Sequence, residues 1–171
     1  MQKKLGIRVV TDPIESAPFP AHSFDIVTAW QTLEHISNPL PFLRAIRRVL
    51  KPRGTLIVEV PNLNDWLLTY FDLPGYQEFY FREAHAFYYS PETLQKMLSA
   101  AGFRGTIRGA RYIPNVLNQF HWILKDAPQA DARTVYAPLH TPLLRDIDRV
   151  YREVIRRRLA SESIMFVGKP K

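Results

Sequence analysis

The sequence contains no cysteine and little glycine. Without cysteine it can form no disulfide, no thiolate metal site and no cysteine nucleophile. Only 7 of the 171 residues are glycine, and none of them forms the Gly-x-Gly pattern that lets a backbone loop approach a nucleotide closely. No apolar run is long enough to span a bilayer, and the charged start is not followed by the apolar segment of a signal peptide. We therefore expect a cytoplasmic protein with no membrane contact.

The composition is sufficient for one domain. With 171 residues, of which 46% are hydrophobic, the chain can bury its own core, so residues 1–171 are predicted to form a single domain. The net charge of +7 attracts polyanions. Few aromatic residues accompany the basic ones on two predicted helices, so nucleic-acid binding is not favoured. These basic residues are Arg44, Arg47, Arg48, Lys51, Arg152, Arg156, Arg157 and Arg158.

The first third of the chain has the pattern of strands around a helix. Short β-branched or apolar runs at Ile7–Val10, Phe24–Trp30 and Thr55–Val60 predict three strands, and the continuous apolarity of Phe24–Trp30 predicts a buried parallel one. Asn38 and Pro39 are typical of a helix start. Apolar residues then recur at helical spacing, at Phe42, Leu43, Ile46, Val49 and Leu50.

The remaining elements follow from similar local signals. The aromatic-rich segment 66–89 predicts a helix and an irregular cover, and Ser90-Pro91 predicts the start of a helix that Gly102 ends. The sequence also predicts a strand over 104–112, helices over 116–124 and from Thr141-Pro142, and a last strand over 163–169.

Three motifs occur in an order typical of one family. Pro18–Val27 is similar to a P-F-P-D-x-S-F-D-V-V segment, and Leu33–Ile36 and Arg48–Gly54 follow it in the same order. Together they resemble class I S-adenosylmethionine-dependent methyltransferases. The resemblance implies an α/β, Rossmann-like fold with a mostly parallel sheet, an antiparallel last strand and helices on both faces. It also implies a helical insertion around residues 113–160.

The resemblance covers the carboxyl-terminal portion of that fold. Ile7–Val10 corresponds to the third strand of the family, so the glycine-rich cofactor loop would lie upstream of Met1. We therefore expect a truncated methyltransferase domain with an incomplete fold. An unpaired edge on Phe24–Trp30 would recruit a neighbour, which predicts self-association or pairing with Ile7–Val10.

The resemblance implies S-adenosylmethionine as the cofactor, with binding by this fragment in doubt. Asp12 corresponds to the acceptor for the adenine amino group, and Ile14 to its apolar neighbour. Trp30 and Gln31 lie at the strand end that contacts the methionine part. An aromatic face there favours a sulfonium cation, although Trp30 also fits a buried core position.

Glu34, His35 and His85 are the expected catalytic residues. With Gln31 one turn earlier, they resemble methyltransferases that hold a divalent metal through a Glu-x-x-Glu-His cluster and a later histidine. Neutral glutamine replaces the first carboxylate and binds hard cations more weakly, so no metal is assigned. Two other roles stay open. His35 can act as a general base, or Glu34 and His35 can tether the helix.

The aromatic segment supplies the expected acceptor pocket, through Trp66, Tyr70 and Tyr80. We predict methyl transfer to a small-molecule or glycan-like acceptor, mainly by positioning and desolvation, and no competence without the missing half. The alternative is a non-catalytic, methyltransferase-like interaction module. A weaker alternative is RNA methylation.

Overall fold

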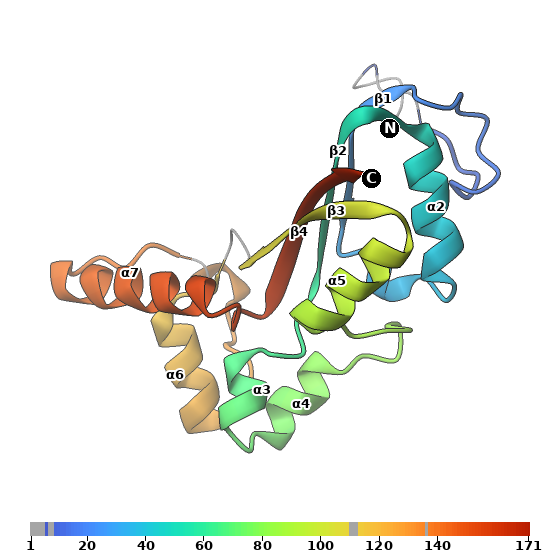
Figure 1. Ribbon diagram of the computed structural model, residues 1–171. Helices are drawn as coiled ribbons and strands as arrows, with labels where there is room; N and C mark the ends of the chain where they lie inside the picture. The colour runs from blue at the N-terminus through green and yellow to red at the C-terminus, as the bar shows by residue number, and fades with distance from the viewer. Residues whose placement is uncertain (1–5, 7–8, 110–112, 136) are drawn as a thin grey trace.

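A four-stranded sheet organises the computed structural model, which describes residues 6, 9–109, 113–135 and 137–171. The strands are β1 (Phe24–Trp30), β2 (Leu50–Pro61), β3 (Phe103–Gly109) and β4 (Ser163–Pro170), in the order β1-β2-β4-β3 (Figure 1). β1 and β2 are parallel, whereas β4 is antiparallel to both β2 and β3. Three strands therefore share one direction and the last strand opposes them, as the sequence predicts. Only one of the three pairings is parallel, because β4 lies between β2 and β3.

Two helices begin where the local signals place them. α2 (Pro39–Val49) has Pro39 in its first turn, and η1 (Leu33–His35) is a single 3-10 turn before it. α5 (Pro91–Ala100) begins with a capping box. There the Ser90 hydroxyl accepts the Thr93 N–H at 3.2 Å, and the Thr93 hydroxyl accepts the Ser90 N–H at 2.8 Å.

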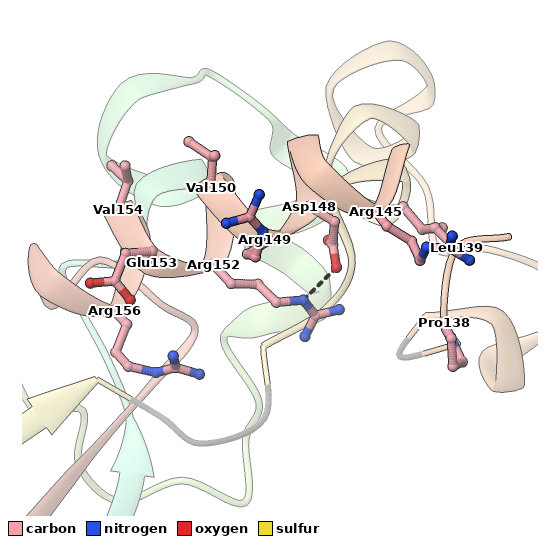
Figure 2. Close-up of a pocket in the computed structure, with 10 residues that line it drawn as sticks. All are labelled: Pro138, Leu139, Arg145, Asp148, Arg149, Val150, Arg152, Glu153, Val154 and Arg156. Atoms are coloured by element: carbon pink, nitrogen blue, oxygen red, sulfur yellow. Dashed lines mark hydrogen bonds and ion pairs between the residues drawn. The ribbon is translucent and has the colours of Figure 1, made fainter. Parts of the chain in front are cut away.

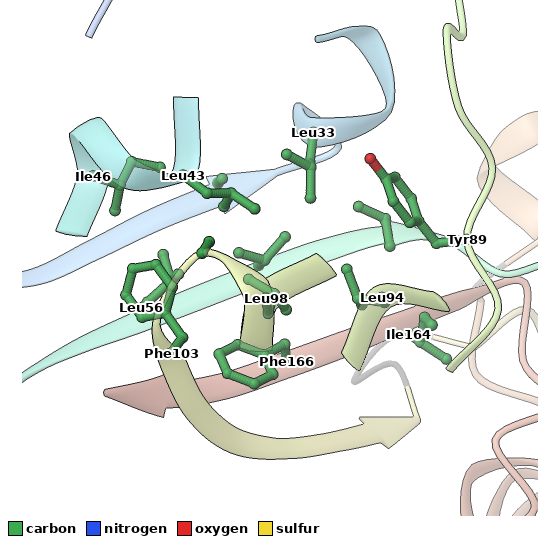
Figure 3. Packing of buried hydrophobic residues seen from close by; sticks show 14 of the residues in the cluster. Leu33, Leu43, Ile46, Leu56, Tyr89, Leu94, Leu98, Phe103, Ile164 and Phe166 are labelled. Carbon is green, nitrogen blue, oxygen red and sulfur yellow. The ribbon is translucent and has the colours of Figure 1, made fainter. Parts of the chain in front are cut away.

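The main core lies between α2, α5 and one face of the sheet. Leu43 of α2 and Leu98 of α5 pack against Leu56 and Phe166 of the central strands, and all four are fully buried (Figure 3). The sequence predicts helices on both faces, but α2 and α5 both cover this one. Ile57, which points to the other face, is only partly buried.

β1 is more exposed than the sequence predicts. It is the outermost strand of the described sheet, and Ile26 and Trp30 are 60% and 51% exposed. The expectation of a buried strand is therefore wrong, because an apolar run indicates a strand but not how many neighbours cover it. Of the predicted strand Ile7–Val10, the first two residues lie outside the described ranges, and Val9 and Val10 form no described strand.

The aromatic-rich segment forms two short helices, α3 (Trp66–Tyr70) and α4 (Pro74–Tyr80). The Asp65 carboxylate caps α3 by accepting the Leu67 N–H at 2.7 Å. The Asp126 carboxylate caps α4 from a distant part of the chain, by accepting the Gly75 N–H at 2.7 Å and the Tyr76 N–H at 2.9 Å. The caps fix both helices beside the carboxyl end of β2.

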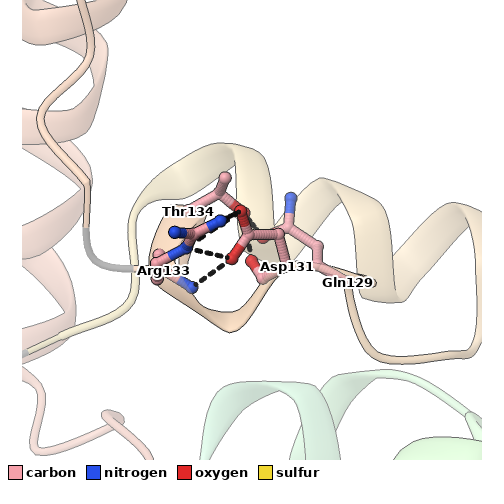
Figure 4. A network of polar contacts seen from close by, with 4 residues as sticks. All are labelled: Gln129, Asp131, Arg133 and Thr134. Atoms are coloured by element: carbon pink, nitrogen blue, oxygen red, sulfur yellow. Dashed lines mark hydrogen bonds and ion pairs between the residues drawn. The ribbon is translucent and has the colours of Figure 1, made fainter.

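A helical segment joins β3 to β4. It contains α6 (Val116–Lys125), η2 (Ala132–Thr134) and α7 (Pro142–Arg157), and α7 projects away from the sheet (Figure 1). The loop before α7 is ordered by polar contacts (Figure 4). Arg133 pairs with Asp131 at 3.0 Å, and the Thr134 hydroxyl donates to Gln129 at 3.2 Å. Among the helices that the structure describes, none is both long and apolar enough to cross a membrane.

Candidate functional site

A cavity of about 510 Å³ opens at the carboxyl ends of β1 and β2, beside the start of β4. Ligands of open α/β sheets bind outside these strand ends. The cavity is lined by Gln31, Glu34, His35, Glu59, Pro61, Phe79, Tyr80, Arg82, Ala84, His85, Glu162 and Ser163.

A tight turn after β1 positions the first of these residues. Gln31 has a φ of +44°, in the left-handed region that residues other than glycine seldom adopt. Its N–H donates to the Glu59 carbonyl of β2 at 2.9 Å, which holds the turn. The chain then enters η1, and η1 carries Glu34 and His35 over the strand ends. Backbone strain of this kind often accompanies a functional site.

The Glu34 side chain is fully buried, and neither of its carboxylate oxygens has a hydrogen-bond partner. Desolvation by burial raises the pKa of this carboxyl above its usual value. The His35 ring is close to this carboxylate, with its Nε2 3.8 Å from Glu34 Oε1. The Glu34 backbone carbonyl accepts the N–H groups of Ala86 and Phe87 at 2.8 and 3.1 Å. These bonds hold the loop that carries His85 against η1.

The orientation of His35 leaves one nitrogen available for chemistry. Its Nδ1 lies 2.8 Å from the Ala84 carbonyl, which can only accept, so Nδ1 carries the proton. In the neutral ring, Nε2 therefore has a lone pair beside the cavity. The His85 ring packs edge-on against His35 with a centroid distance of 4.7 Å. Desolvation, and then the charges of His35 and Arg82, lower the pKa of His85.

The structure thus brings together the three residues expected to be catalytic. Glu34, His35 and His85 each offer one ligand atom, and these atoms lie within 4.8 Å of one another. In the described part of the chain, the buried side-chain atoms without a partner are both oxygens of Glu34, Nδ1 of His85 and the hydroxyl of Tyr89. Burial also raises the pKa of Tyr89 to about 12. Such a group of unsatisfied polar atoms is typical of a binding site.

The donor set also fits a divalent cation. One carboxylate and two imidazoles are ligands that zinc and related metals accept. The hydrogen bond from His35 Nδ1 to the Ala84 carbonyl is the kind of outer contact that orients a metal-binding histidine. The neutral Gln31, which is the reason for assigning no metal from the sequence, lines the same cavity. The geometry therefore keeps both base and metal chemistry open.

Of the three aromatic residues expected in the acceptor pocket, only Tyr80 lines the cavity. Its buried hydroxyl lies 2.8 Å from the Asn62 carbonyl and 3.0 Å from the Glu162 carbonyl. Trp66 instead donates its indole N–H to Gln119 at 2.8 Å, in a separate packing cluster. Tyr70 is 75% exposed at the end of α3. The aromatic composition indicates packing here but does not identify which rings face the cavity.

The structure brings only one of the four expected cofactor residues to the cavity. Gln31 lines the cavity, whereas Asp12, Ile14 and Trp30 do not. Asp12 is exposed in the loop before β1, and Ile14 packs against the main core. Trp30 is 51% exposed, so the alternative of a buried core tryptophan is wrong.

Sequence reasoning misses four polar residues of the cavity, namely Glu59, Arg82, Glu162 and Ser163. Glu59 Oε1 accepts the Ser163 hydroxyl at 3.1 Å and lies 3.5 Å from Gln31 Nε2. A signal for Glu59 is present, because it is the only charged residue in the apolar run Thr55–Val60. Arg82 and Ser163 have no such signal, since their places depend on the tertiary fold.

A larger hollow of about 710 Å³ lies along α7, remote from the strand ends (Figure 2). It is lined by α7 and by Pro138 and Leu139 of the preceding loop. Its least exposed charged side chains already have partners, since Arg152 pairs with Asp148 at 2.6 Å. We therefore place the candidate active site at the smaller cavity.

Comparisons with known proteins show the family to which the chain is related. A family model described as a methyltransferase domain matches residues 4–106, which include β1, β2 and η1. The ubiquinone/menaquinone biosynthesis C-methyltransferase of Paraburkholderia phytofirmans is 33% identical over 107 residues, which cover 53% of this chain and 44% of that protein. A ubiquinone biosynthesis O-methyltransferase of Xanthomonas campestris is 48% identical over 40 residues, or 23% of this chain and 17% of that protein. The chain spans less than half the length of these curated relatives.

Solved structures show the same fold. A SAM-dependent methyltransferase from Thermotoga maritima matches with a TM-score of 0.60 and 18% identity, over 99% of this chain and 67% of that one. Another from Archaeoglobus fulgidus matches with a TM-score of 0.55 and 20% identity, over 94% and 66%. At these identities the likeness concerns the fold alone. It confirms the predicted Rossmann-like α/β class, with a mixed sheet.

Proposed function

This chain belongs to the methyltransferase domain family, and we propose that it takes part in methyl transfer from S-adenosylmethionine to a small-molecule or glycan-like acceptor. The observation that carries this proposal is the strand-end cavity with the buried, unpartnered carboxylate of Glu34 beside His35 and His85. A volume of about 510 Å³ is within the range of small-molecule sites. We place the acceptor in this cavity.

His35 is the proposed general base. Its Nε2 would accept the proton of the acceptor hydroxyl while that oxygen bonds to the methyl carbon, whose bond to the sulfonium sulfur breaks to leave S-adenosylhomocysteine. Glu34, 3.8 Å away, then stabilises the imidazolium that forms. If a divalent cation binds here, Glu34, His35 and His85 would hold it, and it would lower the pKa of an acceptor hydroxyl.

Zinc binding separates the two chemistries. Calorimetry with Zn²⁺ should give saturable binding that His85→Phe abolishes if the cluster is a metal site. If it acts only as a base, wild type and variant should behave alike. Because His85 lies in a loop held by backbone bonds to Glu34, the variant should keep its fold, which circular dichroism checks.

The cofactor is proposed to bind along the end of β1. Gln31 and the half-exposed ring of Trp30 would contact the methionine end, and Asp12 and Ile14 the adenine. The 171 residues contain no glycine-rich loop for the ribose. We therefore propose that the chain binds the cofactor weakly and does not turn over by itself.

Calorimetry with S-adenosylhomocysteine tests this proposal. We expect weak saturable binding, with a dissociation constant on the order of 0.1–1 mM. Trp30→Ala should weaken it, whereas Tyr70→Ala, which removes a more exposed aromatic ring outside the site, should not. Micromolar binding would contradict the proposal that the chain binds the cofactor only weakly. Absence of binding at millimolar ligand would refute the cofactor site in this chain.

A basic hollow supports a second candidate function, that of a non-catalytic module that meets an acidic partner. This hollow of about 570 Å³ lies at the opposite end of the sheet, where β2 and β3 begin. None of the described residues that line it is acidic, and the basic ones are His22, Arg44, Arg47, Arg48, Arg104 and Lys171. A poly-glutamate peptide should bind with steep salt dependence, and Arg47→Glu should weaken it. Unchanged binding in the variant would contradict this function.

We also propose that the outer edge of β1 pairs with another strand. The exposed apolar side chains of Ile26 and Trp30 support this, since such edges recruit neighbours. Ile26→Lys should reduce self-association in sedimentation if a second copy supplies the strand. If Ile26→Lys and wild type have the same sedimentation coefficient at high concentration, pairing of two copies through β1 is contradicted.

A further inference from the structure

α7 carries an apolar stripe on its outer side. Leu143, Ile147, Val150 and Val154 are 71%, 41%, 57% and 44% exposed. They are spaced four, three and four residues apart, which is the heptad spacing of helices that pack against each other. The inner side of α7 is separate, because Ile155 is buried there. The helix therefore has one apolar side that the described chain covers and one that it leaves exposed.

Val150 and Val154 of the outer stripe border the hollow along α7 and are still 57% and 44% exposed. α7 projects from the sheet, and Val150 and Val154 lie on the opposite side of the helix from Arg152 (Figures 1 and 2). Arg152 instead contacts the Ile113 carbonyl and pairs with Asp148 on the inner side. A partner could reach the stripe without disturbing these contacts.

Charges along one flank of the stripe alternate in sign. Asp146, Arg149, Glu153 and Arg157 follow one another on the same side of α7, and all four are exposed. Read in the opposite direction, the order becomes basic, acidic, basic, acidic. An antiparallel second copy would therefore place Asp146 opposite Arg157 and Arg149 opposite Glu153, with the same pairs repeated by the two-fold axis. In a parallel two-fold pair this flank would instead face the other flank of the partner helix, so these charge pairs could not form.

We propose that α7 is a dimer interface, in which the outer stripes of two copies of this chain pack antiparallel about a two-fold axis. Ile147 of one copy meets Val154 of the other, and Val150 lies near the axis. Apolar burial supplies the attraction, and the flanking charges select the direction. The contact is smaller than a standard interface, so we expect a dissociation constant of about 1–100 µM.

Sedimentation velocity over a wide concentration range tests the interface. In an Ile26→Lys background, which removes the proposed pairing through β1, the chain should pass from monomer to dimer in the micromolar range. Val150→Lys should weaken the dimer at least tenfold, because it places a charge near the axis. Leu124→Lys on α6 is the matched control, since Leu124 is 76% exposed outside the stripe, and it should behave as the Ile26→Lys chain alone. A monomer at all concentrations, or a dimer that Val150→Lys leaves intact, overturns the proposal.

Charge reversal tests the direction. Asp146→Lys and Arg157→Glu should each weaken self-association at least fivefold, because each creates two like-charge pairs in an antiparallel dimer. A mixture of the two variants should recover wild-type affinity, since every pair across the mixed dimer is again opposite in sign. Failure of the mixture to recover would refute the antiparallel geometry. All these positions are exposed, so circular dichroism should show an unchanged fold.

Discussion

Replacement of Glu34 by methionine should stabilise the fold while it removes function. Both carboxylate oxygens of Glu34 are buried without a partner, and desolvation raises the pKa of the group. Leaving a buried polar group unsatisfied costs about 1–3 kcal/mol, and an apolar side chain of similar length removes that cost. We therefore expect Glu34→Met to raise the free energy of unfolding by about 1–3 kcal/mol.

Asn62 provides the matched control for this change. It is as fully buried as Glu34, but its amide donates to the carbonyls of Leu159 and Ser161, both at 2.8 Å. Asn62→Leu should lower the free energy of unfolding by about 2 kcal/mol or more, because two backbone acceptors lose their donor. The two substitutions should therefore have opposite signs.

Urea denaturation at pH 7 measures both effects. If the free energy of unfolding depends on urea concentration with the same slope in each protein, the unfolded states are comparable. The same Glu34→Met protein should lose zinc binding, or methyl transfer in any form of the protein that is active. If Glu34→Met destabilises the chain as Asn62→Leu does, the carboxylate has a structural role, and the proposed site is wrong.

Three further predictions concern pH, packing and the proposed base. Burial raises the pKa of Asp65 from 3.8 to about 7. Between these two pH values the native state binds a proton that the unfolded state does not bind. The free energy of unfolding therefore falls as pH rises through this window, by on the order of 4 kcal/mol. Asp65→Asn, which keeps the capping oxygen, should flatten this dependence in urea titrations at pH 4.5 and 8, whereas the exposed Asp72→Asn should leave it unchanged. Gly75→Ala should lower the melting temperature, at a cost of about 1–3 kcal/mol, because a Cβ there would meet the Asp126 backbone oxygen. His35→Asn should leave the unfolding midpoint nearly unchanged and reduce initial methyl-transfer rates about 10²–10⁴-fold, and an active variant would exclude His35 as the base.

Local signals predicted the helices well but not the exposure of the strands. Pro39 and the Ser90 capping box mark the starts of α2 and α5 because the cap interactions involve residues close in sequence. The apolar run of β1 does not indicate how many strands or helices cover it. For this reason Ile26 appears buried from the sequence and is exposed in the structure.

The candidate site was predictable where a motif named its residues. Glu34 and His35 are adjacent in one motif, and the family resemblance pointed to His85 fifty residues later. Their convergence depends on backbone bonds from Ala86 and Phe87 to Glu34, which no local pattern indicates. The aromatic residues of the acceptor pocket were the hardest to predict. Trp66 and Tyr80 have similar surroundings in sequence and differ only in the neighbours that the fold provides.

The position of β4 has a consequence for how the chain acquires its structure. β4 is the latest of the four strands in sequence, yet it lies between β2 and β3, and β3 has no other described strand partner. During synthesis on the ribosome, β3 therefore cannot join the sheet until residues 163–170 have emerged from the exit tunnel. The long sequence separation between β2 and β4 also makes their pairing slow. Nascent chains arrested before Ser163 should stay sensitive to protease around β3, and release of longer chains should bring protection in one step.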